Sequence, residues 1–237
     1  MLEHGGDLAR ASREYGIPEE RWLDLSTGIN PNAYPVPPVP ARVWQRLPGN
    51  AEPLLRAARE CYQAMELLPV AGTQAAIQAL PRLRPHSRVT LAALTYNEYA
   101  HTWQRQGHAV QAVQPREFDA RLAQTDVLVV CNPNNPTGER IGPERLLEWH
   151  TRLAEHDGWL IVDEAYIDPL PHASLVSFAT RPGLIVLRSL GKFFGLAGAR
   201  VGFVATERTL LHALRDEFGP WSVAGPAQFA AIAALRD

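Results

Sequence analysis

Short apolar runs with strand character alternate with longer helix-like segments over most of the chain, from Leu67 to Arg236. The run at 126–131, Asp-Val-Leu-Val-Val-Cys, is typical of a strand buried on both faces. Neighbouring parallel strands need long crossover connections, and the segments between these runs are long enough to supply them as helices. The alternation therefore predicts an α/β fold with a mostly parallel sheet that helices cover on both faces.

The positions of the strands and helices follow from this alternation. Apolar residues at helical spacing between Leu54 and Met65 indicate a helix before the first strand. Gly16 and Gly107 stand where helices are expected to end, because glycine readily adopts the left-handed conformation. Strands are expected at 67–70, 88–93, 109–113, 126–131, 159–163, 184–187 and 199–205. Helices are expected at 7–15, 54–65, 73–83, 96–106, 143–156, 206–218 and 226–236.

A proline-rich stretch separates the start of the chain from the alternating region. Residues 30–40 contain five prolines, which exclude a helix and favour an extended, polyproline-like arm. The arm is either a connector between an N-terminal segment and the main body or a passive surface linker. We expect residues 1–45 to form an N-terminal segment with this arm, and residues 46–237 to form one large domain.

The composition excludes several classes of function. Lys and Arg total 23 and Asp and Glu total 25, so the net charge of −2 lacks the basic excess of a dedicated nucleic-acid binder. The sequence contains neither a membrane-length apolar run nor a signal-peptide pattern at its start, so we expect no membrane partner and a cytoplasmic location. Cys61 and Cys131 cannot make a disulfide framework or a zinc site by themselves, and the eight histidines lack metal-ligand spacing, so we expect no metal.

Ligands of parallel sheets bind at the carboxyl ends of the strands, so the residues after each expected strand are the candidates for chemistry. Gly72 precedes a helix start whose free backbone N–H groups can bind an anion, although most such sequences are only turns. The loop 132–138, with two prolines and three asparagines, either holds a side chain against a ligand or is a tight turn. Asp163 ends a buried strand and needs a cation or a donor nearby, unless it caps a helix.

The segment after the strand at 184–187 carries the most informative polar residues. Ser189, Lys192 and Arg200 lie in an otherwise apolar, glycine-rich stretch. Partial desolvation beside Phe193 would lower the pKa of the Lys192 amine and make it a nucleophile toward a carbonyl. The fork of Arg200 suits bidentate binding of a phosphate. The alternative for Lys192 is a surface lysine that extends its amine into solvent.

Four of these motifs occur in the order found in fold-type I pyridoxal-5′-phosphate (PLP) enzymes. They are Gly-Thr-Gln, Asn-Asn-Pro-Thr-Gly, Asp-Glu-Ala-Tyr and Ser-x-x-Lys-x-Phe-Gly-x-x-Gly-x-Arg. The gaps from Asn135 to Asp163, from Asp163 to Lys192 and from Lys192 to Arg200 are 28, 29 and 8 residues. Over nearly its whole length the chain resembles the class I/II aminotransferase group of these enzymes.

The resemblance implies a role for each residue of these motifs. Lys192 would bind PLP covalently and later move a proton, Asp163 would pair with the pyridine nitrogen, and Tyr96 would stack on the ring, which makes these three the candidate catalytic residues. Asn135 and Tyr166 would hydrogen-bond the phenolate oxygen of the ring. The phosphate would be held by Gly72, Thr73, Gln74, Ser189 and Arg200.

The start of the chain narrows the resemblance. His4-Gly5-Gly6 and the later Leu-Asp-Leu-Ser-Thr-Gly-Ile-Asn-Pro, which ends at Pro31, are similar to the L-threonine-O-3-phosphate decarboxylases of cobalamin synthesis. The resemblance implies substrate-binding roles for His4, Gly5, Gly6 and Asn30, and decarboxylation of L-threonine O-3-phosphate to aminopropanol phosphate. It also implies a small phosphorylated amino-acid substrate and a homodimer.

Two alternatives stay open beside the decarboxylase. The histidinol-phosphate aminotransferases share the PLP motifs, which do not by themselves decide which bond at Cα breaks. Similar enzymes continue beyond the position of Asp237 into a C-terminal small domain, which we expect this chain to lack. The second alternative is therefore a PLP-binding remnant with little activity.

Overall fold

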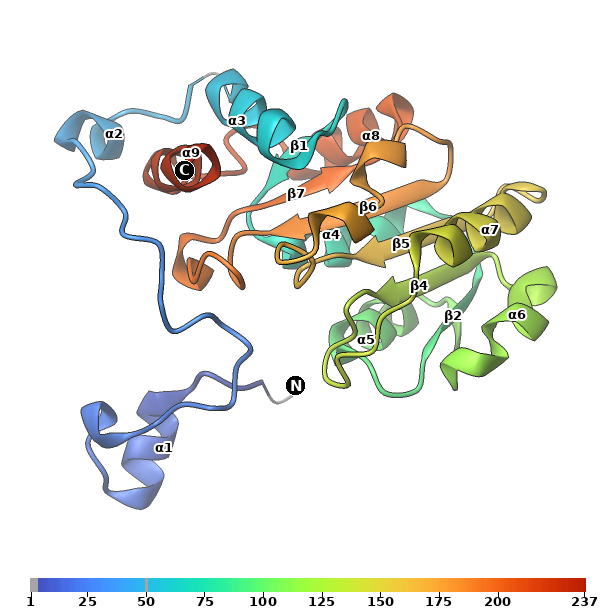
Figure 1. Cartoon of the computed structure of the whole chain (residues 1–237), viewed down its shortest axis with the longest axis horizontal. Helices are drawn as coiled ribbons and strands as arrows, with labels where there is room; N and C mark the ends of the chain where they lie inside the picture. The colour runs from blue at the N-terminus through green and yellow to red at the C-terminus, as the bar shows by residue number, and fades with distance from the viewer. Residues whose placement is uncertain (1–3, 50) are drawn as a thin grey trace.

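The computed structural model describes residues 4–49 and 51–237, so the first three residues of the N-terminal segment lie outside the described part. A seven-stranded sheet with the order β1-β7-β6-β5-β4-β2-β3 forms the centre of the molecule (Figure 1). β2 to β6 run parallel, whereas β7 runs antiparallel to both β6 and β1. The strands are β1 (Leu68–Val70), β2 (Arg88–Ala92), β3 (Ala109–Val113), β4 (Val127–Cys131), β5 (Trp159–Asp163), β6 (Leu184–Ser189) and β7 (Gly202–Ala205). The predicted α/β fold with a mostly parallel sheet is confirmed.

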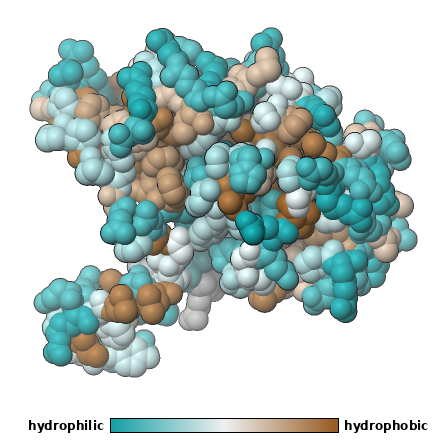
Figure 2. All heavy atoms as spheres, in the orientation of Figure 1, coloured by the Kyte–Doolittle hydropathy of each residue, from teal (hydrophilic) through white to brown (hydrophobic). Residues whose placement is uncertain are grey.

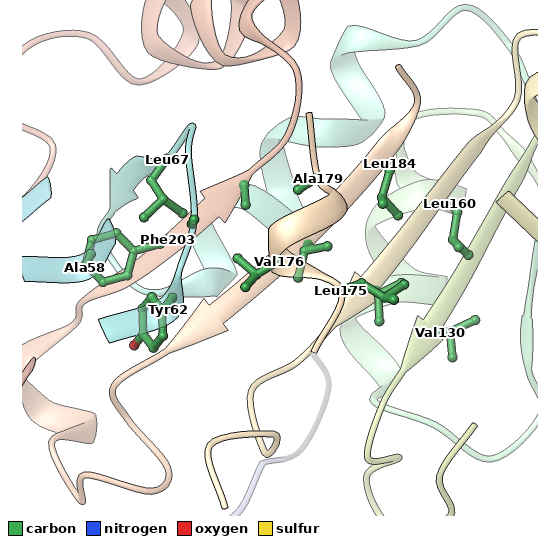
Figure 3. Close-up of a cluster of buried hydrophobic side chains, with 14 of the residues drawn as sticks. Ala58, Tyr62, Leu67, Val130, Leu160, Leu175, Val176, Ala179, Leu184 and Phe203 are labelled. Atoms are coloured by element: carbon green, nitrogen blue, oxygen red, sulfur yellow. The ribbon is translucent and has the colours of Figure 1, made fainter. Parts of the chain in front are cut away.

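Helices cover both faces of the sheet, and each face has its own apolar cluster. Within β5, Leu160 and Val162 belong to one cluster while Trp159 and Ile161 belong to the other, as the alternation of side chains along a strand requires. Figure 3 shows Val130, Leu160 and Leu184, from three neighbouring strands, in the first of these clusters. This first face is covered by α3 (Glu52–Tyr62), α6 (Phe118–Arg121), α7 (Pro143–Ala154) and α9 (Gly225–Arg236). The opposite face is covered by α4 (Thr73–Ala79), α5 (Asn97–Arg105) and α8 (Arg208–Phe218).

The expected elements differ from the structure mainly at their ends. The last strand begins at Gly202 rather than at 199, because a 3₁₀ turn at Ala197–Ala199 is followed by Arg200 in the left-handed conformation, with φ of 53°. The helix expected at 73–83 ends at Ala79 and continues as a 3₁₀ helix at Leu80–Leu83, which contains Pro81. The short helix α2 (Ala41–Gln45) and α6 were not predicted.

The N-terminal segment projects from this body (Figure 1). It contains α1 (Leu8–Tyr15), whose N-cap Asp7 accepts a hydrogen bond from the Arg10 backbone and whose end is Gly16, with φ of 66°. The proline-rich arm that follows is extended and is attached to the loop after β6. The backbone N–H groups of Asn30 and Tyr34 donate to the carbonyls of Lys192 and Phe194, at 3.0 and 2.9 Å. The arm is therefore a connector attached to the body rather than a passive linker.

Candidate active site

Lys192 lies in the loop that follows β6 and is partly buried. Desolvation lowers the pKa of its amine; the carboxylate of Asp163 opposes this shift and the charge of Arg200 adds to it. The Nζ atom lies 5.4 Å from the centre of the Tyr166 ring. A lowered pKa increases the fraction of unprotonated amine, which is the form that attacks a carbonyl carbon.

Asp163, the last residue of β5, is buried but faces the same space. Its Oδ2 accepts a hydrogen bond from the Tyr99 hydroxyl at 2.9 Å, and its Oδ1 accepts one from the Ala165 backbone at 3.0 Å. Burial raises the pKa of this carboxyl, against the effect of the two hydrogen bonds and of Lys192. Since a buried carboxylate is stabilised by a cationic donor, Asp163 suits a protonated ring nitrogen.

Gly72 makes room for Arg200. A Cβ atom at residue 72 would lie 2.5 Å from Arg200 Nη2, and the φ of 74° at this position also favours glycine. The guanidinium donates to the Ala197 carbonyl at 3.1 Å, and within residues 4–49 and 51–237 it forms no ion pair. Arg200 is therefore available to bind a phosphate next to the first residues of α4.

These groups line one cavity of about 130 Å³ at the carboxyl ends of β4, β5 and β6. The register places the ends of β4 and β5 side by side, with Cys131 opposite Asp163, while β6 extends further to Ser189. Every predicted cofactor residue except Gly72 lines this cavity: Thr73, Gln74, Tyr96, Asn135, Asp163, Tyr166, Ser189, Lys192 and Arg200.

A PLP molecule fits the chemistry of this lining. An amine, a buried carboxylate and the Arg200 guanidinium match the aldehyde, the pyridine nitrogen and the phosphate of PLP. The hydroxyl of Ser189 is buried and accepts a hydrogen bond from the Gly191 backbone at 3.1 Å, so its own hydrogen remains available for a phosphate oxygen. The Tyr96 hydroxyl donates to Gln74 Oε1 at 3.2 Å, which restrains the ring expected to stack on the cofactor.

A wider cavity of about 940 Å³ adjoins this lining and reaches the N-terminal segment. It shares Tyr96, Tyr166, Lys192 and other residues with the smaller cavity, and it is lined in addition by His4, Gly5 and residues 25–29. The structure therefore brings His4 and Gly5, far away in sequence, next to residues that also line the smaller cavity. A substrate with a phosphate and a carboxylate could lie in this space.

The four residues predicted to bind substrate differ in their placement. His4 and Gly5 line the wider cavity. The Gly6 backbone donates to Ser26 Oγ at 2.8 Å, and Gly5 also lies against Ser26. Asn30 uses its side chain to attach the arm, since its Nδ2 donates to the Phe193 carbonyl at 2.8 Å and its Oδ1 accepts from the Asn32 backbone at 2.9 Å. The substrate-binding roles of all four remain predictions.

Three further residues shape the site and were not among the predicted site residues. Tyr99, which donates to Asp163, stands three residues after Tyr96, the N-cap of α5, and the two rings lie 6.3 Å apart. Gly28 passes against Tyr166, because a Cβ at residue 28 would lie 2.5 Å from the Tyr166 hydroxyl oxygen. Glu98 is buried and joins His4 to Gln74, and no local sequence signal indicates this link.

The sequence matches the family described as aminotransferase class I and II over residues 54–237. The chain belongs to this family. The membership predicted from the ordered motifs is thus confirmed, and the motif residues of the family converge on the cavity described above.

Two relatives and one solved structure show how far the likeness extends. The chain is 53% identical to a threonine-phosphate decarboxylase of Pseudomonas aeruginosa over 100% of its own length and 72% of that protein. It is 31% identical to a histidinol-phosphate aminotransferase of Shewanella oneidensis over 86% of its own length and 52% of that protein. The histidinol-phosphate aminotransferase structure from Sinorhizobium meliloti, in complex with pyridoxal-5′-phosphate, matches 100% of this chain and 69% of that one, with a TM-score of 0.77 and 22% identity. At that identity the structure supports the family's fold alone.

Proposed function

We propose that this protein is a PLP-dependent decarboxylase that converts L-threonine O-3-phosphate to aminopropanol phosphate and CO₂ in cobalamin biosynthesis. The convergence of Lys192, Asp163 and Arg200 on one cavity carries the proposal, in a chain 53% identical to a threonine-phosphate decarboxylase. This identity exceeds the 31% shared with the aminotransferase from Shewanella oneidensis, and it therefore favours the decarboxylase.

In this proposal each residue has a defined task toward the cofactor. Lys192 offers its amine to the aldehyde of PLP, Asp163 keeps the ring nitrogen protonated, and Ser189 and Arg200 hold the phosphate. Bound PLP supplies a ring that accepts the electron pair left at Cα when the carboxylate departs as CO₂. Lys192 then delivers a proton to Cα, which balances the loss of CO₂ and gives the amine product.

The substrate would enter through the wider cavity. His4 and Gly5 line that cavity, and a histidine ring and backbone N–H groups can donate to a phosphate. We therefore keep His4, Gly5, Gly6 and Asn30 as the proposed substrate side of the site, with Asn30 acting through the arm it attaches. Tyr96 and Lys192 line both cavities, so the substrate and the cofactor would meet there.

The deciding experiment combines absorbance with CO₂ release. Purified protein would be mixed with PLP, and L-threonine O-3-phosphate would then be added without any keto acid. We expect an absorbance band of bound PLP that shifts with substrate, together with CO₂. A band with no CO₂, followed by amino transfer once a keto acid is added, would establish the aminotransferase instead. A band with neither activity would leave a PLP-binding remnant.

We also propose a homodimer located in the cytoplasm, organised as segment 1–45 and domain 46–237. Large apolar side chains are exposed within residues 1–45, including Tyr15, Leu23, Leu25 and Trp44, and Figure 2 shows hydrophobic residues on the part around α1 that projects at the lower left. A second copy of the chain would cover such a surface. Light scattering should give twice the mass of the chain, and a monomer mass would contradict the proposal.

None of the helices formed by the described residues is both long and apolar enough to cross a membrane. In the same part of the chain, no group of three or more His, Cys, Asp or Glu side chains is placed to hold a metal ion.

A further inference from the structure

Glu98 lies in the first turn of α5 and is buried, in contact with Gln74 of the smaller cavity and His4 of the wider one. A buried carboxylate is stable only where donors or cations compensate for its lost hydration. The two oxygens of Glu98 meet this requirement with partners from two different parts of the chain. One partner belongs to the N-terminal segment and the other to α4.

Each oxygen has one short contact. Gln74 Nε2 donates to Glu98 Oε2 at 2.6 Å, and His4 Nε2 lies 2.7 Å from Glu98 Oε1. Because an ionised carboxylate only accepts hydrogen bonds, the amide nitrogen of Gln74 must face Glu98. The amide oxygen of Gln74 is then turned toward Tyr96, whose hydroxyl donates to it at 3.2 Å.

The pKa of Tyr96 is consistent with the role of its hydroxyl as the hydrogen-bond donor. Burial raises the pKa of Tyr96 to about 12, and the charge of Glu98 is the next largest cause. Tyr96 therefore keeps its hydroxyl hydrogen and donates it to Gln74. The ring of His4 lies 6.1 Å from the ring of Tyr96, so the substrate-side and cofactor-side residues are close neighbours around one carboxylate.

We infer that Glu98 is a positioning residue that links the substrate side of the site, through His4, to the cofactor side, through Gln74 and Tyr96. The inference rests on the proposed function, because it takes His4 as a substrate contact and Gln74 as a cofactor contact. It assigns to one buried carboxylate the placement of residues that are 94 and 24 positions away in sequence.

The inference predicts a crossed pattern of defects. His4→Ala should raise the KM for L-threonine O-3-phosphate about tenfold and leave the Kd for PLP unchanged, since only the substrate side is lost. Gln74→Ala should raise the Kd for PLP about fivefold, since only the cofactor side is lost. Glu98→Ala should produce both defects together.

Double variants separate positioning from general damage. Adding His4→Ala to Glu98→Ala should raise KM no further, because the contact between His4 and Glu98 is already lost. For the same reason, adding Gln74→Ala to Glu98→Ala should raise the Kd for PLP no further. Both Kd and KM would be measured on the full chain, by absorbance titration and by CO₂ release. Effects that multiply in both doubles, or an unchanged Glu98→Ala variant, would overturn the inference.

Two further variants serve as controls. Glu98→Gln keeps one acceptor oxygen for Gln74 and presents an NH₂ group to His4, so it should raise KM while the PLP Kd stays at the wild-type value. If Glu98→Ala failed to fold, the Glu98→Gln variant would decide the inference. A KM that did not rise, or a Kd for PLP that rose with it, would reject the inference. Glu217→Ala is the matched control, because it removes a carboxylate of α8 that pairs with Arg82, away from both cavities.

The experiment also distinguishes failure of the proposed function. If wild-type protein bound PLP but released no CO₂, the decarboxylase would be rejected while the PLP titrations still tested the link to Gln74. The link to His4 would then be read from limited proteolysis of the N-terminal segment. His4→Ala and Glu98→Ala should increase cleavage equally and without adding in the double variant, whereas unequal or additive cleavage would reject that link.

Discussion

The sheet body and the N-terminal segment obtain their structure in different ways. No residue in 4–49 is buried, whereas strands β4, β5 and β6 are buried along their whole length. The body holds its own apolar clusters on both faces of the sheet. The N-terminal segment is attached by hydrogen bonds near Lys192, by Tyr34 and α2 against α9, and by His4 on Glu98.

The sheet body therefore determines the stability of the protein, whereas we expect the N-terminal segment to contribute to substrate binding. Apolar burial stabilises the body, so substitutions in its core should lower the free energy of unfolding. The N-terminal segment completes the wall of the wider cavity without adding buried core. Substitutions there should therefore change substrate binding while the free energy of unfolding stays nearly constant.

The largest effect is expected at the chemical centre of the body. Lys192→Ala should abolish the absorbance of covalently bound PLP and lower CO₂ release by about 10³-fold or more, since both the amine and the proton donor are lost. Thermal unfolding should change little, because this side chain is only partly buried. Persistence of the covalent absorbance would disprove the assignment of Lys192.

The next prediction compares the two regions directly through stability. Leu160→Ala empties a fully buried position on β5 and should lower the free energy of unfolding by about 2–5 kcal/mol. Leu25→Ala, at a side chain 82% exposed, should change it by less than about 0.5 kcal/mol. Urea denaturation of both variants measures the contrast, and equal losses would remove the distinction between the regions.

A smaller effect should appear when the start of the chain is displaced. In Gly5→Ala the new Cβ would lie 2.1 Å from the Ser26 carbonyl oxygen, so the first residues must move. We expect the KM for L-threonine O-3-phosphate to rise about tenfold while the free energy of unfolding stays constant. Gly49→Ala is the matched control, since nothing lies within 4 Å of a Cβ there. Equal KM values in the two variants would show that residues 4–6 do not contribute to the site.

The smallest effect concerns the pH dependence of Lys192. Burial and the charge of Arg200 lower the pKa of Lys192, and the carboxylate of Asp163 raises it. Removing Asp163 should therefore lower this pKa, and removing Arg200 should raise it. Asp163→Asn should shift the pH–rate profile for attachment of pyridoxal to lower pH, and Arg200→Gln should shift it to higher pH. Pyridoxal lacks the phosphate, so the loss of phosphate contacts in Arg200→Gln does not affect the measurement. Shifts in the same direction would contradict this electrostatic arrangement.

The accuracy of the sequence predictions depended on how local each signal is. The run at Val127–Cys131 is apolar on both faces, so its pattern alone identifies a buried strand. Arg200, by contrast, was predicted to lie inside a strand, whereas the structure places it in the left-handed conformation after the turn at Ala197–Ala199, with its guanidinium next to Gly72. The short helix α2 packs against α9, more than 180 positions later in the chain, and its own sequence carries no strong helix signal.

The sequence by itself determined the α/β class, the parallel core of the sheet, the family, and nine of the residues that line the cofactor cavity. Those features rest on local periodicity and on motifs that follow strands whose ends meet at one edge. Only the tertiary structure decided that His4 and Gly5 line a cavity together with Lys192 and that Asn30 attaches the arm. It alone also showed that Glu98 joins His4 to Gln74. Such contacts depend on how the folded chain brings distant residues together, and no pattern of neighbouring residues encodes them.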